Sequence, residues 1–503
     1  MKLSDLLAAL HAETDTVSIS FDHPIAGVSH HAAWIEPGFV FVARHGATQD
    51  AHHFIPEAIA RGAVAVVGEG FAGSHELPIP YLRVADARQA LAQIALWLND
   101  DPAAKLTLVG VTGTKGKTTT TWLLHHLLQE NGIRSGFMST VGYSLADGVL
   151  HHFPAHFTTP EAPQVQQTLR AMVESGCSHA VIEASSHALA LQRLHGIRFH
   201  TAVWTNLTAE HLDFHGDMER YFAAKRMLVD QAAFAVLNHD DPWAMRLRPV
   251  AHTSYSSAAP ADWWVSRVTE LPLELQLTVH APHEMFDVVL PLVGRYNIAN
   301  ALAAMAAAYH LGVTTQQIRQ ALATFRGVPG RMQTIQQEPV RVIVDFAHTP
   351  ISLEYALTAL RTTTRNRLIV VIGSAGGNRY PGKRAPLGAV ATRSADLAIF
   401  TEEDSRSTPI DEILAEMQRG AEEQQRSNYL LIADRYQAIR TAIHHARPGD
   451  TVVLAGKGPE PTLERAHETI PWDEAAIARQ ILAQLGTLAE PAALSPPTTP
   501  DSR

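Results

Sequence analysis

Cysteine is almost absent from this 503-residue sequence, which contains only Cys177, and no apolar run is long. A single thiol excludes an internal disulfide framework and fits a reducing compartment, so we expect a cytoplasmic protein. No run reaches the roughly 18 apolar residues that a membrane-spanning helix needs. Fifty acidic residues outnumber forty basic ones, which excludes a general basic surface for nucleic acid. We therefore expect no membrane insertion and no nucleic-acid partner, and we favour a monomer.

Lysine is also scarce, since the forty basic residues comprise seven lysines and thirty-three arginines. Four of the seven lysines adjoin a glycine: Lys115, Lys117, Lys383 and Lys457. Lysine offers a compact point charge and a titratable amine, neither of which arginine can mimic. The retained lysines therefore point to sites where that chemistry is used.

The length predicts about three domains at roughly 150 residues each. Residues 1–103 alternate short apolar strands, such as 39–43 and 63–67, with helical segments, and a linker is predicted near Asp100 to Ala104. From Leu106 onward strands alternate with helices, which favours mostly parallel sheets covered on both faces. A turn cluster near 327–330 precedes five further short apolar strands, a pattern typical of a doubly wound domain.

The expected fold class is α/β in three domains followed by a tail. The domains are a small α/β unit (1–103), a central unit with a mostly parallel sheet (104–329) and a C-terminal Rossmann-like domain (330–488), and the Pro/Ser/Thr-rich tail (489–503) is predicted to be disordered.

The strongest local signal is the segment GVTGTKGKT, Gly110 to Thr118, between a predicted strand and a predicted helix. Its glycines allow the backbone N–H groups to face phosphate oxygens, and the helix N-terminus adds a favourable partial charge. Lys117 can reach the terminal phosphates, and the Thr118 hydroxyl can ligate Mg²⁺. The strict P-loop pattern is not met, because Val111 occupies its first glycine position.

Three further residues suggest a metal neighbourhood. Glu183 ends a predicted strand and could hold Mg²⁺, although a solvated strand-end glutamate is the alternative. His211 lies four residues before His215, but neither a cysteine nor an HExxH pattern supports zinc, which leaves a Mg²⁺ ligand or a structural histidine. Lys225 lies in a predicted helix just beyond them, where a solvated lysine is the alternative.

The sequence resembles the Mur ligase family over residues 107 to about 465. The resemblance rests on GVTGTKGKTTT, HFTTPEAP, VIEASSHAL, TNLTAEHLDFHGDMERYFAAKRML, VGRYNIANALAA, GVPGRMQ and VDFAHTP, in that order. TTPEAP together with ASSHAL is most similar to the branch that adds the third amino acid. The resemblance implies a uridine-nucleotide-binding unit, a central ATPase and an amino-acid-binding Rossmann-like unit.

The same resemblance implies a role for each matching position. ATP and its phosphates would be held by Gly113, Thr114, Lys115, Gly116, Lys117, Thr118, Thr119, Asn297, Asn300, Arg331 and Asp345. Two Mg²⁺ ions would be held by Thr118, Glu183, His211 and a CO₂-derived carbamate on Lys225. The muramyl dipeptide would contact Thr158, Thr159, Ser185 and Arg193, and the incoming amino acid Arg384, Asp404, Arg406, Gly456 and Glu460. Catalysis would depend on Lys117, Glu183, His211, Lys225 and Arg331.

The implied reaction is ATP-dependent amide formation. The terminal carboxylate of UDP-MurNAc-L-Ala-D-Glu attacks the γ-phosphate, and an amine then attacks the resulting acyl-phosphate. Closure of the domains is expected to exclude water, because acyl-phosphates hydrolyse.

Three departures from the family pattern matter. The family's Asp-Ser-Arg reads His31-Ala32-Ala33 here, so the uridine contacts must differ. The Asp-Asn-Pro-Arg of the diaminopimelate-adding enzymes reads Glu403-Asp404-Ser405-Arg406, and Pro459 replaces the histidine of AGKGHE. The added acidity favours a substrate that ends in an amine, so we expect L-lysine or L-ornithine over meso-diaminopimelate.

Two alternatives remain open at this stage. A ligase resembling folylpolyglutamate synthetase would share the ATPase core, but TTPEAP and AGKGPE argue against it. A non-catalytic nucleotide-binding relative would keep the fold without turnover, and the intact Lys117, Glu183, His211, Lys225 and Arg331 argue against that.

Overall fold

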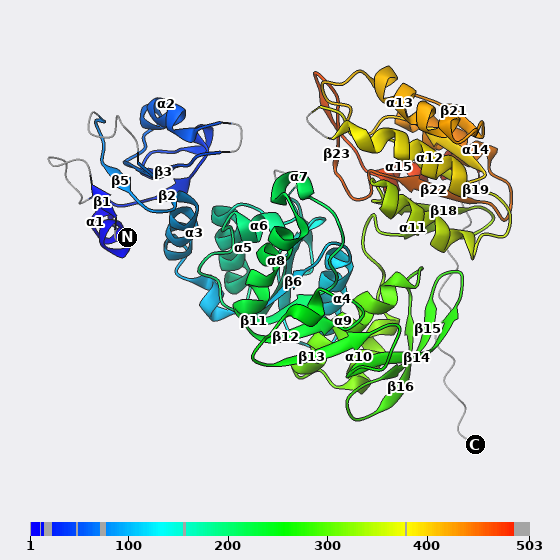
Figure 1. Cartoon of the computed structure of the whole chain (residues 1–503), viewed down its shortest axis with the longest axis horizontal. Helices are drawn as coiled ribbons and strands as arrows, with labels where there is room; N and C mark the ends of the chain where they lie inside the picture. Colours follow the sequence, from blue (N-terminus) through cyan, green and yellow to red (C-terminus); the bar gives the residue numbers. More distant parts are fainter. Residues whose placement is uncertain are drawn as a thin grey trace. The chain divides into compact units, whose positions relative to one another are not determined.

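The computed structural model describes residues 2–10, 12–14, 23–46, 49–70, 77–153, 157–377 and 380–486 (Figure 1). The chain forms two compact units. The first comprises Met1–Val268, Gln276–Leu290 and Tyr296–Phe325, and the second comprises Thr269–Leu275, Pro291–Arg295 and Arg326–Arg503. The domain boundary predicted at 103/104 therefore falls inside the first unit, and the predicted tail, 489–503, lies outside the described residues. Among the described residues, no helix combines the length and apolar character needed to cross a bilayer.

The N-terminal part of the first unit is a five-stranded sheet in the order β1-β5-β4-β3-β2, in which the last four strands are parallel. Its elements are α1 (Leu3–Ala9), β1 (Glu13–Thr14), β2 (Gly27–Ser29), η1 (Ala32–Trp34), β3 (Phe39–Ala43), η2 (Ala51–Phe54), α2 (Ile55–Ala60), β4 (Ala65–Gly68), β5 (Tyr81–Arg83), α3 (Ala87–Leu98) and η4 (Pro102–Lys105). Alternate residues of β3 serve two cores: Val40 and Val42 pack with α1 and α3, whereas Phe41 and Ala43 pack with η1 and α2. The predicted linker near residue 100 contains the short helix η4.

The central part is an eleven-stranded sheet in the order β16-β15-β14-β13-β12-β11-β6-β10-β7-β8-β9. Its strands are β6 (Thr107–Thr112), β7 (Ser135–Ser139), β8 (Gly142–Ser144), β9 (Leu150–His151), β10 (His179–Glu183), β11 (Phe199–Trp204), β12 (Ala232–Asn238), β13 (His252–Ser256), β14 (Trp263–Glu270), β15 (Leu275–His280) and β16 (Met285–Leu290). The strands from β12 to β7 are parallel, as the strand–helix alternation predicts, whereas β8 and β9 add an antiparallel edge.

Helices connect these central strands. They are α4 (Lys117–Gln129), α5 (Ala162–Glu174), α6 (Ser186–Ala190), α7 (Leu212–His215), α8 (Met218–Asp230), η5 (Ala244–Arg246), α9 (Tyr296–His310) and α10 (Thr315–Ala323). The parallel register places the carboxyl ends of β6, β10 and β11 at one edge, since Val111 pairs with both Glu183 and Val203. The residues that follow these three strands are therefore gathered at that edge.

The second unit is built on a six-stranded sheet in the order β17-β18-β22-β19-β20-β21. Its elements are β17 (Gln333–Gln336), β18 (Arg341–Asp345), α11 (Pro350–Arg361), β19 (Leu368–Ile372), η6 (Pro381–Lys383), α12 (Arg384–Ser394), β20 (Leu397–Phe400), α13 (Ile410–Glu423), β21 (Tyr429–Leu431), α14 (Arg435–His445), β22 (Thr451–Ala455), β23 (Thr462–Glu464), β24 (Thr469–Pro471) and α15 (Glu474–Gln484). All neighbours except β17 and β18 pair in parallel. Cores lie on both faces of the sheet, which is the doubly wound arrangement.

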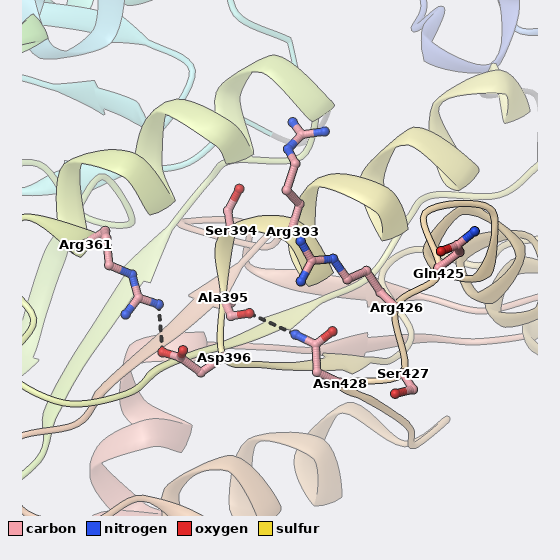
Figure 2. A pocket seen from close by; sticks show the side chains of 9 residues that line it. All are labelled: Arg361, Arg393, Ser394, Ala395, Asp396, Gln425, Arg426, Ser427 and Asn428. Atoms are coloured by element: carbon pink, nitrogen blue, oxygen red, sulfur yellow. Dashed lines mark hydrogen bonds and ion pairs between the residues drawn. The ribbon is translucent and has the colours of Figure 1, made fainter.

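A polar depression of about 540 Å³ lies at the amino ends of β20 and β21 (Figure 2). It is lined by Arg361, Arg393, Ser394, Ala395, Asp396, Gln425, Arg426, Ser427 and Asn428. No residue of the sequence-predicted site lines it. The predicted site residues of the second unit that follow β20 and β22 lie at the opposite, carboxyl ends of these strands.

Candidate active site

The glycine-rich loop joins β6 to α4 and is braced by the segment after β11. The N–H of Thr114 donates to the carbonyl of Asn206 at 2.7 Å, and the N–H of Lys115 donates to the Asn206 side-chain oxygen at 3.0 Å. A Cβ on Gly113 would lie 1.8 Å from the hydroxyl oxygen of Thr205. The close approach of these two segments therefore requires glycine there. Thr118 and Thr119 lie in the first turn of α4, whose free N–H groups are suited to anions.

Two lysines converge on this loop. Lys117 Nζ donates to the carbonyl oxygens of Gly113 and Thr114 at 2.9 and 3.0 Å, and Lys225 Nζ donates to that of Gly113 at 2.7 Å. Lys225 is 1% exposed. Burial, with Lys117 nearby, lowers the pKa of Lys225 well below its ordinary value. Lys225 is therefore a buried lysine and not the solvated helix lysine of the alternative.

Lys115 points to a different partner, because its Nζ lies 2.8 Å from a carboxylate oxygen of Glu210. Burial raises the pKa of Glu210, but Lys115 and other cations hold it below its usual value. Glu210 was not among the predicted site residues, although it lies inside the motif TNLTAEHLDFHGDMERYFAAKRML.

Glu183 is fully buried at the end of β10 and is not a solvated strand-end residue. Its carboxylate accepts from the N–H of Thr140 at 2.9 Å and from the hydroxyl of Thr140 at 3.1 Å. Thr158 lies beside this group, within 3.2 Å of the Thr140 hydroxyl. Thr159 donates to the carbonyl of Glu183 at 2.6 Å and to the hydroxyl of Ser185 at 3.1 Å. The residues expected to hold the muramyl dipeptide therefore surround the expected Mg²⁺ ligand.

Arg193 extends this group toward the N-terminal sheet. Its guanidinium donates to the carbonyl of Thr159 at 2.8 Å and to Glu161 at 2.6 Å. Arg44, which follows β3, donates to the other oxygen of Glu161 at 3.2 Å. Burial raises the pKa of the Glu161 carboxyl, but Arg193 and Arg44 hold it below its usual value. Glu161 lies within TTPEAP, yet the sequence analysis assigned it no role.

His211 precedes the single-turn helix α7 with a φ of +58°. Its ring centroid lies 4.9 Å from that of His187, which in turn lies 5.5 Å from that of His215. Burial lowers the pKa of His211, and it lowers those of His187 and His215 to about 4, so neutral rings capable of metal ligation are favoured. His215 instead contacts the Ser186 hydroxyl at 3.0 Å.

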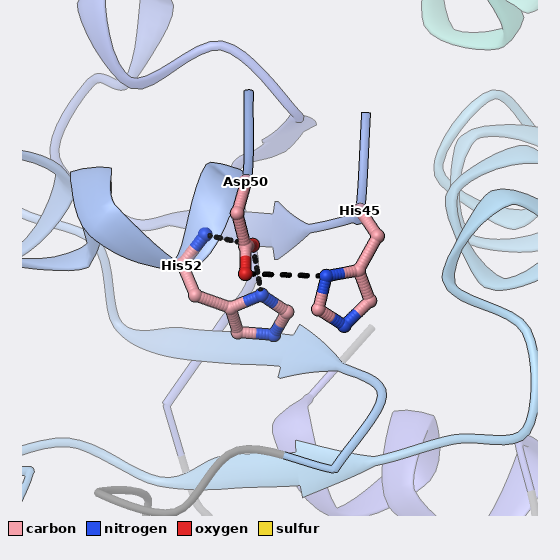
Figure 3. Close-up of side chains that lie close together, drawn as sticks. All are labelled: His45, Asp50 and His52. Carbon is pink, nitrogen blue, oxygen red and sulfur yellow. Dashed lines mark hydrogen bonds and ion pairs between the residues drawn. The ribbon is translucent and has the colours of Figure 1, made fainter. Parts of the chain in front are cut away.

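Within the described residues, one group of three histidine, cysteine or acidic side chains has the spacing of metal ligands, and it lies in the N-terminal part of the first unit and not at the predicted Mg²⁺ site (Figure 3). The Asp50 carboxylate lies 2.6 Å from Nδ1 of His52 and 3.2 Å from Nδ1 of His45. Backbone and side-chain hydrogen bonds from His52 help to lower the pKa of Asp50 to about 2. The sequence analysis missed this group, whose only signal is the short spacing His45-x₄-Asp50-x-His52. Hydrogen bonding among the three side chains accounts for their arrangement.

Asn297 and Asn300 lie on the first turns of α9 and are both buried. Asn300 donates to the side-chain oxygen of Asn297 at 2.9 Å. A Cβ on Gly116 would lie 2.2 Å from the side-chain oxygen of Asn300, so this amide packs against the glycine-rich loop. Asn300 was expected to lie near the adenine of ATP. Its observed neighbour is Gly116 of the glycine-rich loop.

In the second unit, Arg331 and Asp345 are adjacent. The Arg331 guanidinium lies 4.5 Å from the Phe346 ring centroid. Asp345 accepts from the N–H groups of Met332 at 2.7 Å and Ala347 at 2.9 Å, and burial raises its pKa. A Cβ on Gly330 would lie 2.3 Å from the nitrogen of Pro459, so GVPGRMQ packs against AGKGPE.

The residues expected to bind the amino acid form a buried ionic cluster. Lys457 Nζ donates to Asp404 at 2.8 Å and to Glu460 at 2.6 Å. Arg406 Nε donates to Glu464 at 2.7 Å and one of its terminal nitrogens donates to Asp404 at 3.2 Å. Burial raises the pKa of Glu460 to about 7 in spite of Lys457. Asp404, Arg406 and Glu460 are therefore brought together in one cluster.

Two atoms of this cluster have no partner among the described residues: Oε2 of Glu403 and the remaining terminal nitrogen of Arg406. Glu403 is 5% exposed, and a Cβ on Gly456 would lie 2.7 Å from that Oε2. Glu403 was not among the predicted site residues, although it occupies the first position of the four-residue motif. Arg384 points elsewhere, pairing with Glu416 of α13 at 3.1 Å.

The fold and site define an ATP-dependent ligase: a P-loop ATPase with a buried lysine and carboxylate at its phosphate loop, and a doubly wound unit bearing a buried ionic cluster. Two family descriptions match, Mur ligase middle domain over residues 111–308 and Mur ligase, glutamate ligase domain over residues 330–458. The chain belongs to the Mur ligase family. Members are ATP-dependent amide ligases, and this chain is an enzyme of that class.

Similar proteins cover nearly the whole chain. UDP-N-acetylmuramyl-tripeptide synthetase of Deinococcus radiodurans is 57% identical over 96% of this chain and 100% of its own. UDP-N-acetylmuramoyl-L-alanyl-D-glutamate–2,6-diaminopimelate ligase of Gloeobacter violaceus is 39% identical over 96% and 98%. A solved structure of a ligase with that second name has a TM-score of 0.65 at 28% identity, covering 97% of this chain and 99% of its own.

The folylpolyglutamate synthase alternative is represented by a Mycobacterium tuberculosis structure with a TM-score of 0.60. It is 17% identical and covers 73% of this chain and 91% of its own. At that identity the likeness shows a shared fold alone.

Proposed function

We propose that this chain adds the third amino acid to UDP-MurNAc-L-Ala-D-Glu in cytoplasmic peptidoglycan precursor synthesis, with L-lysine or L-ornithine preferred over meso-diaminopimelate. In this proposal residues 1–103 bind the uridine nucleotide, 104–329 bind ATP and 330–488 bind the amino acid. The observation that carries it is the convergence of Lys117 and Lys225 on the Gly113 carbonyl, at 2.9 and 2.7 Å. The printed names of the relatives at 57% and 39% identity support the substrate class.

ATP binding is assigned to residues of both units. The backbone from Gly113 to Thr119 cradles the phosphates, and Lys117 moves from its loop carbonyls to the terminal phosphate oxygens. Asn297 and Asn300 support the loop and face the adenosine. Asp345 binds the ribose, and Arg331 reaches the γ-phosphate, where it offsets the charge of the transferred group.

The residues present fit two Mg²⁺ ions and a carbamate on Lys225. Thr118, Glu183 and His211 offer the hydroxyl, carboxylate and neutral imidazole that this metal site needs. Lys225 is buried, and burial lowers its pKa, which favours the unprotonated amine that reaction with CO₂ requires. When bound, the Mg²⁺ ions offset negative charge on the phosphates.

The muramyl dipeptide is held by Thr158, Thr159, Ser185 and Arg193, which surround Glu183. An oxygen of the terminal carboxylate attacks the γ-phosphorus, a P–O bond forms and ADP leaves. The amine of the amino acid, having lost its proton, attacks the acyl carbon, and phosphate leaves as the amide forms.

The proposed preference for an amine-terminated amino acid rests on two atoms without a partner among the described residues, Oε2 of Glu403 and one terminal nitrogen of Arg406. The free nitrogen of Arg406 is suited to the α-carboxylate and Oε2 of Glu403 to the distal ammonium. Asp404 and Glu460 are already paired with Lys457, so Glu403 is the acid that remains available. Glu403 is nearly buried, and a carboxylate placed beside it would be repelled, which disfavours meso-diaminopimelate. Arg384 is paired with Glu416, and its assignment to the amino acid rests on the family resemblance alone.

The test is ATP-dependent phosphate release with UDP-MurNAc-L-Ala-D-Glu and Mg²⁺, supplying L-ornithine, L-lysine or meso-diaminopimelate in turn. We expect release that requires both the nucleotide dipeptide and a diamino acid, with the two amine-terminated substrates at least about 10-fold better in kcat/KM. Preference for meso-diaminopimelate would refute the proposal that Glu403 receives the distal ammonium. Release with no amino acid would refute third-residue addition.

A further inference from the structure

The carboxyl edge of the N-terminal sheet carries an exposed aromatic pair where the family motif Asp-Ser-Arg is absent. β2 ends at Ser29 and is followed by His30, His31 and the short helix η1, which ends at Trp34. Ligands of open parallel sheets bind outside the carboxyl ends of the strands. This edge is therefore the place to look for the contacts that replace the missing motif.

Trp34 is 49% exposed although it is a large apolar side chain. His31 is stacked on it with ring centroids 4.8 Å apart and an interplanar angle of 21°, and His30 meets it edge-on at 6.4 Å. No other ring contacts Trp34 among the described residues. One face of the indole is therefore backed by an imidazole, and the remaining ring surface is open to a flat partner.

His30 adds a polar group beside this surface. Its Nδ1 is buried and has no hydrogen-bond partner within the described part of the chain. Burial, with Arg44 nearby, lowers the pKa of His30 to about 4, so the ring is a neutral donor and acceptor. A buried polar atom without a partner is costly unless a ligand satisfies it.

The edge is also continuous with the dipeptide site. Arg44 follows β3, the strand beside β2, and binds Glu161 at 3.2 Å. Glu161 binds Arg193 at 2.6 Å, and Arg193 binds the carbonyl of Thr159 at 2.8 Å. A substrate with its carboxylate near Glu183 and its nucleotide end beyond Arg44 would reach the aromatic pair.

We infer that Trp34, backed by His31, stacks on the uracil of the UDP-linked substrate, and that Nδ1 of His30 hydrogen-bonds the nucleoside. This inference rests on the proposed function for the identity of the nucleotide. It accounts for binding without Asp-Ser-Arg, because stacking on an indole needs neither a carboxylate nor a guanidinium.

The experiment measures UDP binding by calorimetry with the full-length protein, together with KM and kcat for UDP-MurNAc-L-Ala-D-Glu. Trp34→Ala is expected to raise the Kd for UDP roughly 10- to 100-fold, which corresponds to about 1.4–2.7 kcal/mol. KM for the nucleotide dipeptide should rise by a similar factor while kcat changes little. Trp34→Phe should recover most of the affinity.

The matched control is Trp264→Ala. Trp264 is stacked on His280 at 4.0 Å in the central sheet, so the same ring pair is removed outside the proposed site. This variant should bind UDP as the wild type does. A second control is the dipeptide on MurNAc 1-phosphate, which lacks the uridine, and on which wild type and Trp34→Ala should have equal kcat/KM.

Unchanged UDP binding in Trp34→Ala would overturn the inference. So would an equal loss of activity on both dipeptide substrates, which would show a structural role for Trp34. If UDP binding depends on Trp34 but no amine supports phosphate release, the inference holds and the proposed function fails. If the ligase is active and Trp34→Ala binds UDP and the nucleotide dipeptide as the wild type does, only the inference fails.

Discussion

At the scale of single residues, Lys225 has the most unusual surroundings of the candidate site. It is buried, donates to the loop carbonyl of Gly113 at 2.7 Å, and lies 4.9 Å from the Tyr221 ring centroid. An amine there can lose its proton, whereas a guanidinium cannot. Lys225→Arg should therefore lower kcat by about 10²-fold or more, in line with the loss of one charge-stabilising group in an enzyme site.

The measurement combines steady-state kinetics with ¹³C NMR after incubation in ¹³C-bicarbonate. The wild type should show a carbamate signal that Lys225→Arg lacks. Lys105→Arg, at an exposed lysine paired with Asp100, should leave both signal and kcat unchanged. Full activity of Lys225→Arg would contradict the role.

Glu460 predicts a pH dependence for the amino acid. Its pKa is raised to about 7, mainly by burial, so the carboxyl gains its charge as the pH rises through neutrality. A charged Glu460 adds negative charge beside Glu403, the residue proposed to receive the distal ammonium, so KM for the amino acid should fall between pH 6 and pH 8. In Glu460→Gln this fall should vanish, while the exposed Glu468→Gln should keep it. A fall that persists in Glu460→Gln would assign the titration to another group.

Residue types in a known motif order were enough to propose Asp404, Arg406, Glu460 and Glu183 as site residues, and their roles stay predictions. Glu403 was not predicted, because its importance depends on which carboxylates are already paired. Lys457 and Arg406 engage Asp404, and Lys457 engages Glu460, which leaves Oε2 of Glu403 alone. Which carboxylate pairs with which cation depends on how the segments after β20 and β22 pack together, and the order of residues in the sequence does not predict it.

At the scale of elements, α4 has a positive-φ glycine at each end. Gly116 has a φ of +86° and a Cβ there would lie 2.2 Å from the Asn300 side chain. Gly132 has a φ of +75° and nothing within 4 Å of its Cβ position. Both alanine variants incur the left-handed backbone cost of about 1–2 kcal/mol. Only Gly116→Ala also distorts the phosphate loop.

We therefore expect Gly116→Ala to raise the KM for ATP at least about 10-fold. Gly132→Ala should lower the free energy of unfolding by about 1 kcal/mol and leave the KM for ATP unchanged. Denaturant titration and ATP kinetics on both variants provide the check. Equal KM values would show that the contact with Asn300 does not shape the loop.

Strands with strong local patterns were predictable and weak ones were not. The strand predicted at 39–43 has the observed bounds of β3, because a buried parallel strand is a continuous apolar run. Strands β13 to β16 were not predicted, and there exposed and buried residues mix, as in β14. The two-residue strand β9 is too short to show any period.

At the scale of the whole molecule, the proposed ATP site draws on both compact units. The phosphate loop and Lys225 belong to the first, whereas Arg331 and Asp345 belong to the second. The proposed assignment therefore makes phosphoryl transfer depend on a residue of the second unit, Arg331.

Arg331→Ala should therefore lower kcat by about 10²-fold while the Kd for ATP changes less than about threefold, because Arg331 acts on the transferred phosphoryl group and not on ground-state binding. Arg326→Ala, at an exposed arginine five residues earlier, should behave as the wild type. Steady-state kinetics and ATP binding by calorimetry on both variants provide the check. A variant that loses ATP affinity and kcat in equal measure would assign Arg331 to ATP binding rather than to phosphoryl transfer.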